Sequence, residues 1–176
     1  MLYTGNGDGG DTTLFGSAQR FFKSDEQFCA LGSLDTLNAY LGVIKTQVDG
    51  SWFDTIEELQ QELFILQAQL AGATMSITDA HITQMEKKIQ EIEATLPPIT
   101  TFLLSGGTSV AAHLDYARTL ARTFERDLIA LHQKQKSTSN VRAYANRLSS
   151  YLFALSRKHN HEAHVDELPP RYGDKS

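Results

Sequence analysis

Small and hydroxyl-bearing residues crowd the start of the chain, where residues 3–13 read Tyr-Thr-Gly-Asn-Gly-Asp-Gly-Gly-Asp-Thr-Thr. Glycine lets backbone N–H groups approach a ligand closely, so this composition predicts a phosphate-binding loop. Arg20 and Lys23 follow closely enough to supply positive charge. The segment contains a G-x-G-x-x-G spacing but no strand of useful length before it, and no Gly-Lys-Ser/Thr triplet occurs, so dinucleotide and Walker loops are not indicated. A flexible glycine-rich end is the alternative.

A second candidate is a row of charged residues at spacings of three and four, which places Arg118, Arg122, Glu125 and Arg126 on one face of a helix. The planar guanidinium group suits phosphate or carboxylate ligands, so this face together with the glycine-rich loop would form an anion site. An ordinary solvated face, with Glu125 paired locally, is the alternative.

Three further polar residues lie near apolar stripes. Asp35 and Asn38 share a face of an early helix, and Asn146 precedes the stripe of the last one. A buried Asp needs a partner, for which Arg118 is a candidate.

The third candidate is the connection 99–108, an apolar run that ends in Gly106 and Gly107. It is interpreted either as a strand-like piece that covers one end of the protein or as the wall of a ligand pocket. In both cases Thr108 or Ser109 is expected to cap the following helix.

The elements that position these residues are helices, because apolar residues recur every three or four positions in five segments. The segments are about 25–46, 56–70, 82–96, 110–131 and 141–155, with Thr78 as a predicted N-cap of the third. This spacing is typical of helices that pack at shallow angles. The sequence therefore predicts an all-α, five-helix bundle in one domain over 1–176, with a loop over 1–24, a bundle over 25–159 and a flexible tail over 160–176.

Composition excludes several classes of protein. The 176 residues carry a formal net charge of -5 and no basic run, which argues against a nucleic-acid binder. The apolar runs are too short for a membrane span. The single cysteine, Cys29, cannot form an internal disulfide and is expected to pack, so a cytoplasmic protein is the expectation. His159, His161 and His164 lack framing ligands, and no metal site made of side chains is predicted.

Taken together, the segments resemble the PduO-type ATP:cob(I)alamin adenosyltransferases. That family's pattern is Tyr-Thr-x-x-Gly-Asp-x-Gly-x-Thr, then Asp-x-Leu-Asn, Phe-x-x-x-Gly-Gly, Ala-Arg-x-x-x-Arg-x-x-Glu-Arg and Asn-Arg-Leu-Ser. Here the five blocks occupy residues 3–12, 35–38, 102–107, 117–126 and 146–149, in the same order. The resemblance implies a five-helix bundle that assembles into a homotrimer with active sites between subunits.

The resemblance also implies a role for each matching residue. The ATP triphosphate would be held by Thr4, Gly5, Asn6, Gly7, Asp8, Thr12 and Lys23 of one subunit and by Arg122, Glu125, Arg126 and Asn146 of its neighbour. Asp35 would pair with Arg118 across the interface. Phe102 and Arg122 would be catalytic, with Phe102 displacing the lower axial ligand of the corrinoid.

In the implied reaction, cob(I)alamin attacks the 5′ carbon of ATP and expels triphosphate, and magnesium accompanies ATP. A corrinoid reductase and an adenosylcobalamin-dependent enzyme are the implied protein partners. The chain departs from the family pattern at Gly5, Gly9 and Thr123, where basic residues are usual, and at Thr36, Ser105 and Ser150. These departures motivate an alternative, a corrinoid or nucleotide carrier or sensor without catalysis. A plain helical scaffold is the third interpretation.

Overall fold

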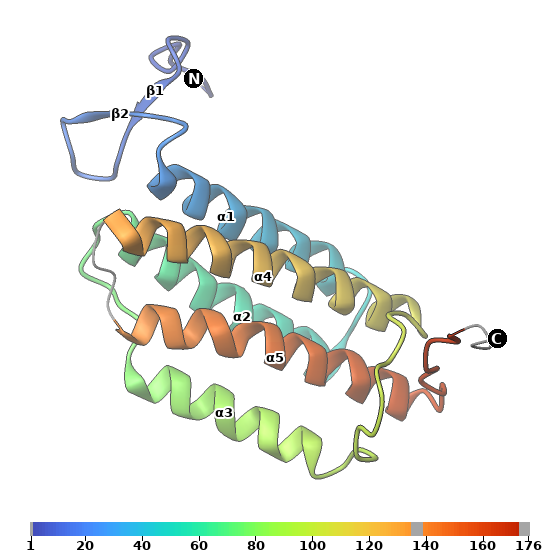
Figure 1. The fold of residues 1–176 in the computed structure, drawn as a ribbon. Coiled ribbons are helices and arrows are strands. Elements are labelled where there is room, and N and C mark those ends of the chain that lie inside the picture. The colour runs from blue at the N-terminus through green and yellow to red at the C-terminus, as the bar shows by residue number, and fades with distance from the viewer. Residues whose placement is uncertain (1, 135–138, 173–176) are drawn as a thin grey trace.

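The computed structural model describes residues 2–134 and 139–172, and five helices dominate it (Figure 1). The helices are α1 (Glu26–Lys45), α2 (Gly50–Leu70), α3 (Asp79–Glu93), α4 (Ser109–Lys134) and α5 (Ser139–Glu162), after the strands β1 (Asp11–Thr13) and β2 (Arg20–Phe22). Within the bundle α4 packs on both α1 and α5, α2 packs on α1, and α3 packs on α5. The predicted five-helix fold is confirmed.

The core follows the predicted apolar stripes most closely on α4 and α5. Every stripe residue of these two helices is buried: Val110, Leu114, Ala117, Ala121, Phe124, Leu128 and Leu131 on α4, and Val141, Tyr144, Leu148, Leu152 and Leu155 on α5. On α1 the buried line runs instead through Ala30, Leu34, Leu37, Leu41 and Ile44. Phe28 and Leu31, which belong to the apolar spacing of the segment 25–46, line an open cavity beside α2 instead of entering the core.

The short N-terminal hairpin was not predicted. Strands β1 and β2 pair antiparallel with Thr12 opposite Phe21, and Figure 1 shows them projecting beyond the start of α1. Each strand has three residues, too few to show the period-two alternation by which a strand is recognised. The hairpin connects the glycine-rich segment to Lys23, so it determines where Lys23 lies relative to the loop.

Two expectations near the ends of the bundle need correction. Cys29 is exposed because it lies on the solvent-facing side of α1, whereas its neighbour Ala30 faces the core. Helix α5 continues to Glu162, three residues beyond the expected boundary at 159, because Asn160 is buried and belongs to the core face. Among the described residues, no helix is both long and apolar enough to cross a membrane.

Candidate functional site

A cavity of about 430 Å³ opens between the connection before α4, helix α4 and helix α5. Its lining brings together Phe102, Arg118 and Arg122 from two of the predicted candidate segments, and Phe153 of α5 closes one side. Phe102 is 80% exposed, and the guanidinium of Arg118 lies 5.8 Å from the centre of the Phe153 ring. Aromatic rings and guanidinium groups thus share one pocket, and the connection 99–108 forms a pocket wall as one of its two interpretations stated.

Backbone N–H groups of the connection 99–108 donate hydrogen bonds to buried side chains of α4 and α5. Asp115, which is 6% exposed, accepts a hydrogen bond of 3.0 Å from the Gly106 N–H and one of 3.3 Å from Arg118 Nε. Thr108 is the N-cap of α4, since its hydroxyl accepts the Ala111 N–H at 3.1 Å. The cap predicted for Thr108 or Ser109 is therefore Thr108.

The sequence reasoning overlooked Asp115, although a signal was present. Asp115 lies four residues after the buried Ala111, and a polar residue at a stripe position of an amphipathic helix is a candidate for a buried, hydrogen-bonded role. Its carboxylate fixes Arg118 from within the same chain. Arg118 therefore already has one anionic partner, and the pairing with Asp35 of another subunit stays a prediction.

The charged face of α4 has the spacing that was expected. Arg122 is exposed, lines the cavity and forms no ion pair within the part of the chain that the structure describes. Asn146 of α5 donates a hydrogen bond of 2.8 Å to Glu125, which fixes that carboxylate across the two helices. Arg126 donates a hydrogen bond of 3.1 Å to the Thr123 hydroxyl and forms no ion pair with another described residue. One guanidinium, that of Arg122, is thus available in the cavity for an anionic ligand.

The glycine-rich loop folds over the side chain of Lys23. The Lys23 ammonium group donates a hydrogen bond of 2.8 Å to the Gly7 carbonyl, and the Lys23 N–H donates one of 2.9 Å to the Gly10 carbonyl. A Cβ on Gly7 would lie 2.9 Å from Lys23 Nζ, so any other residue there would displace the ammonium group. Lys23 therefore lies against the loop, and a side chain at position 7 would move its ammonium group away from the Gly7 carbonyl.

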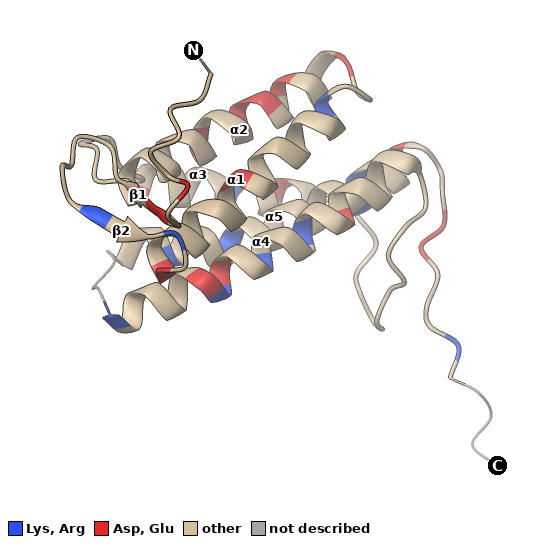
Figure 2. Cartoon of the chain, turned by 90° about the horizontal axis from the view of Figure 1, so that it is seen from above, with Lys and Arg blue, Asp and Glu red and all other residues tan. Residues whose placement is uncertain are grey.

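Arg20 ties the loop to the hairpin. Its guanidinium forms an ion pair with Asp11 on the paired strand and donates a hydrogen bond to the Asn6 carbonyl. The hydrogen bond from Arg20 lowers the pKa of the Asp11 carboxyl, and the same bond raises the pKa of Arg20. Figure 2 shows basic and acidic segments side by side on this hairpin and interleaved along α4. The guanidinium of Arg20 is therefore occupied mainly by contacts that organise the loop. Thr12, another predicted site residue, lies in strand β1.

A second cavity, of about 660 Å³, lies between the hairpin, α1 and α2. Its lining is mostly apolar and includes the 81% exposed Phe15 and the 61% exposed Phe64. Asp35 stands at this cavity and accepts a hydrogen bond of 3.2 Å from Gln67. The premise that Asp35 is buried is wrong for one chain, because its helix face is left open here.

The predicted site residues therefore form separate groups within one chain. Phe102, Arg118 and Arg122 meet in one cavity, the glycine-rich loop contacts Lys23 through the Gly7 and Gly10 carbonyls, and Asp35 lies in the other cavity. In the described residues no hydrogen bond or ion pair joins the loop to Arg122, Arg126 or Asn146.

Comparison with known proteins gives consistent results. The model of the family described as cobalamin adenosyltransferase matches residues 2–159. The chain is 34% identical over 183 residues to the corrinoid adenosyltransferase PduO of Salmonella typhimurium, covering 97% of this chain and 54% of that protein. It is 32% identical over 176 residues to the corrinoid adenosyltransferase of Bacillus subtilis, covering 95% and 90%. Thus it spans only about half the length of the PduO relatives from Salmonella typhimurium and Citrobacter freundii.

A solved structure extends the similarity to the fold. It is a variant of the PduO-type ATP:corrinoid adenosyltransferase from Lactobacillus reuteri, complexed with cobalamin and ATP. The TM-score is 0.92 at 30% sequence identity, and the match covers 98% of this chain and all of the other.

Proposed function

Because the chain belongs to the cobalamin adenosyltransferase family, we propose that it transfers the 5′-deoxyadenosyl group of ATP to cob(I)alamin. In this reaction the cobalt(I) centre of the substrate supplies an electron pair to the 5′ carbon of ATP. A cobalt–carbon bond forms, the bond from that carbon to the triphosphate oxygen breaks, and triphosphate leaves with the bonding electrons. A corrinoid reductase that supplies cobalt(I) and an enzyme that uses adenosylcobalamin are the protein partners that this chemistry requires.

The observation that carries the proposal is the shared cavity of Phe102 and Arg122. An exposed aromatic ring gives an apolar surface against a flat macrocycle, and Phe102 would displace the lower axial ligand of cobalamin there. Arg122, which has no anionic partner within the described chain, would stabilise the charge of the leaving triphosphate. Catalysis would then arise from positioning the two reactants and from stabilising the leaving group.

The nucleotide side of the site draws on the loop. The Lys23 ammonium group, the backbone of Thr4 to Asp8 and the Thr12 hydroxyl would bind the triphosphate. Lys23 already fixes the Gly7 carbonyl, so the loop is shaped before a nucleotide arrives. Glu125 and Asn146, which bond each other at 2.8 Å, would complete the site from a neighbouring subunit, together with Arg122 and Arg126 of that subunit.

Magnesium would enter with ATP. In the described residues no group of three His, Cys, Asp or Glu side chains lies together as a metal cage. Phosphate oxygens would supply most of the magnesium ligands, as is usual where magnesium accompanies a nucleotide. Asp8 is the exposed carboxylate within the loop that could add one protein oxygen.

We further propose a homotrimer. The apolar cavity beside Asp35 exposes large hydrophobic side chains, including Phe15 and Phe64, which indicates a surface that a partner covers. Asp35 and Arg118 lie on different cavities of one chain, so their pairing requires a head-to-tail contact between copies. A head-to-tail contact closes into a ring when its rotation allows.

The first test is an anaerobic assay that mixes the protein with ATP, magnesium and chemically reduced cobalamin. We expect loss of the cob(I)alamin absorbance together with equal amounts of adenosylcobalamin and triphosphate. Binding of cobalamin without formation of the cobalt–carbon bond would refute the enzyme and favour a carrier or sensor.

Two variants separate the roles within the cavity. Phe102→Ala should leave ATP binding unchanged and impair the reduction of cobalt(II), because the ring acts on the corrinoid. Arg122→Ala should weaken the use of ATP by about 1.5 to 3 kcal/mol, the range for a hydrogen bond to a charged group. The control is Lys87→Ala, which removes an exposed positive charge of α3 outside the cavity. Equal losses of folding stability in the first two variants would mean that the site is misplaced.

Mixing two inactive variants tests the shared site. Lys23→Ala damages the loop and Arg122→Ala damages the cavity. In a randomly mixed cyclic trimer with sites between subunits, about a quarter of all sites combine one intact half from each variant. Regain of about a quarter of the wild-type activity after the subunits are exchanged is expected, and no regain would place both halves in the same chain.

A further inference from the structure

The connection that carries Phe102 is anchored by groups from the C-terminal part of the chain. We call residues 97–108 the Phe102 loop and residues 163–172 the C-terminal segment. The Phe102 ring is 80% exposed, so contacts of its own side chain do little to fix it, and its position depends on the loop backbone. The anchors on each side of Phe102 therefore decide where the ring stands in the cavity.

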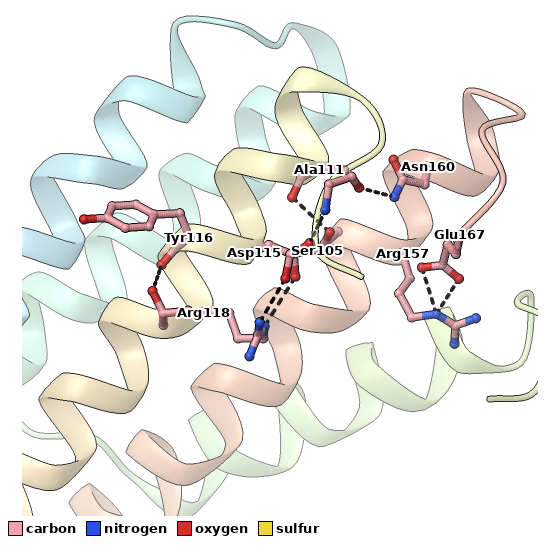
Figure 3. A network of polar contacts seen from close by, with 11 residues as sticks. Ser105, Ala111, Asp115, Tyr116, Arg118, Arg157, Asn160 and Glu167 are labelled. Atoms are coloured by element: carbon pink, nitrogen blue, oxygen red, sulfur yellow. Dashed lines mark hydrogen bonds and ion pairs between the residues drawn. The ribbon is translucent and has the colours of Figure 1, made fainter. Parts of the chain in front are cut away.

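The first anchor is Arg157 of α5, which is only 6% exposed. Its Nη2 donates a hydrogen bond of 2.9 Å to the Pro97 carbonyl at the start of the loop. Its Nε bonds the carboxylate of Glu167, at 2.9 Å to one oxygen and 3.2 Å to the other (Figure 3). One buried guanidinium thus links the Phe102 loop to the C-terminal segment, and Glu167 is its anionic partner.

The second anchor lies after Phe102. The Leu104 N–H donates a hydrogen bond of 2.8 Å to the carbonyl of Leu168, the residue that follows Glu167. The two anchors therefore hold the backbone five residues before and two residues after Phe102. Both depend on the place of the same short stretch of the C-terminal segment.

A defined turn brings this stretch back to the loop. At the end of α5 the Val165 N–H donates to the Asn160 carbonyl and the His164 N–H donates to the His161 carbonyl, with His164 at φ +54°. These bonds form a Schellman motif, which reverses the chain direction at a helix end. The reversal aims the C-terminal segment along the Phe102 loop.

Figure 3 shows that Asn160 completes the arrangement at the far end of the loop. Its side chain, 3% exposed, donates to the Gly106 carbonyl at 2.8 Å and accepts the Thr108 N–H at 2.9 Å. This third contact fixes the glycine end independently of the C-terminal segment. Loss of Glu167 should therefore free the Phe102 side of the loop and leave the start of α4 in place.

From this geometry we propose that Glu167 is a positioning residue for Phe102, acting through Arg157 and the Leu168 carbonyl. The inference rests on the proposed function, since it assigns the C-terminal segment to the corrinoid side of the reaction. Glu167 and Leu168 lie beyond residue 159, where the family match ends. The ordinary alternative is an ion pair that stabilises the fold and leaves Phe102 unaffected.

The test compares Glu167→Ala and Glu167→Gln with Asp166→Ala in the full chain. Asp166 is the exposed neighbouring carboxylate, so its loss removes the same charge without touching Arg157. Hydrogen exchange is measured on the protein without ligands. We expect exchange of the Leu104 amide to accelerate about ten-fold or more in Glu167→Ala, with α1 and α4 unchanged and Asp166→Ala equal to wild type.

Kinetics then decide whether the anchoring matters for the corrinoid. In Glu167→Ala we expect kcat/KM for cobalamin, assayed from the cobalt(II) form with a reductant present, to fall about ten-fold or more, because small misplacements of a positioning group are costly, while KM for ATP stays within about two-fold. Glu167→Gln, which keeps a hydrogen-bonding oxygen, should recover part of the loss. If Glu167→Ala fails to fold, Glu167→Gln against Asp166→Ala decides the question alone.

Unchanged exchange at Leu104 would overturn the proposal, and so would faster exchange with unchanged corrinoid kinetics. A wild-type chain without turnover is a different outcome, which refutes the proposed function. In that case hydrogen exchange of the Leu104 amide in Glu167→Ala still tests whether the anchor exists. Exchange at the wild-type rate overturns the anchor.

Discussion

Substitution of Gly107 by alanine probes the tightest contact at the end of the Phe102 loop. A Cβ built on Gly107 would lie 2.3 Å from Asn160 Oδ1 and 2.6 Å from both Cγ and Nδ2 of that side chain. Real Cβ contacts are not that short, so either the loop or Asn160 must move. The backbone φ of +106° adds strain, since residues with a side chain rarely adopt it.

The neighbouring glycine supplies a control of similar backbone strain. Gly106 has a φ of +127°, but a Cβ there would meet nothing within 4 Å. Gly106→Ala should therefore cost only backbone strain, about 1 to 3 kcal/mol. Gly107→Ala should cost that strain plus about 1 to 3 kcal/mol of overpacking. Displacement of Asn160 from its bonds to Gly106 and Thr108 adds about 1 kcal/mol for each bond lost.

The expected difference between the two variants is thus at least about 2 kcal/mol in the free energy of unfolding. Urea titrations followed by circular dichroism measure it, at one protein concentration because association stabilises the folded state. Adding Asn160→Ala to Gly107→Ala should remove the overpacking, so the double variant should lose less than the sum of its parts. Equal losses for Gly106→Ala and Gly107→Ala would refute the reasoning.

Three other predictions concern titration and the hairpin. Burial raises the pKa of Tyr144 well above 10 and also raises that of Tyr151, so the folded state binds their protons more tightly than the unfolded state, and stability should fall as pH rises above about 10. Tyr144→Phe should flatten that loss in thermal melts while costing about 1.5 to 3 kcal/mol at neutral pH through its 2.7 Å bond to the Glu62 carboxylate. Burial lowers the pKa of His159, so stability should decline as pH falls below 6.5, and His159→Gln should remove that part of the decline. Arg20→Ala should speed protease cleavage within residues 3–23 in the absence of ATP, and cleavage at the wild-type rate would contradict a role in organising the loop.

The bundle could be predicted from the sequence because burial is periodic. On α4 and α5 the helix faces the core along its whole length, so every third or fourth residue is apolar and buried. On α1 the same reasoning failed at Phe28 and Leu31, since apolar residues also line the open cavity beside α2. Periodicity identifies an apolar face without showing whether the chain itself or a partner covers it.

The anchors of the Phe102 loop could not be predicted from local patterns. Arg157 and Pro97 are 60 residues apart, and Asn160 and Gly106 are 54 apart, so no short motif connects them. A partial signal exists, because Asn160 continues the line of Leu152 and Ser156 at intervals of four. A polar residue in such a line must find a buried partner, but the sequence does not say which one.

The difference between the two kinds of knowledge has a physical origin. Residues proposed to bind a ligand are restricted in type by its chemistry, so Lys23 and Arg122 could be singled out from type and spacing, whereas the role of Phe102 was implied by the family resemblance. Residues that hold those groups in place are restricted only by geometry. An ion pair such as that of Arg157 and Glu167 can form between any two positions that the fold brings close together. A residue that acts through a hydrogen bond to a distant backbone carbonyl has no recognisable pattern in its neighbouring sequence. Positioning groups of this site therefore become visible only once the helices are assembled.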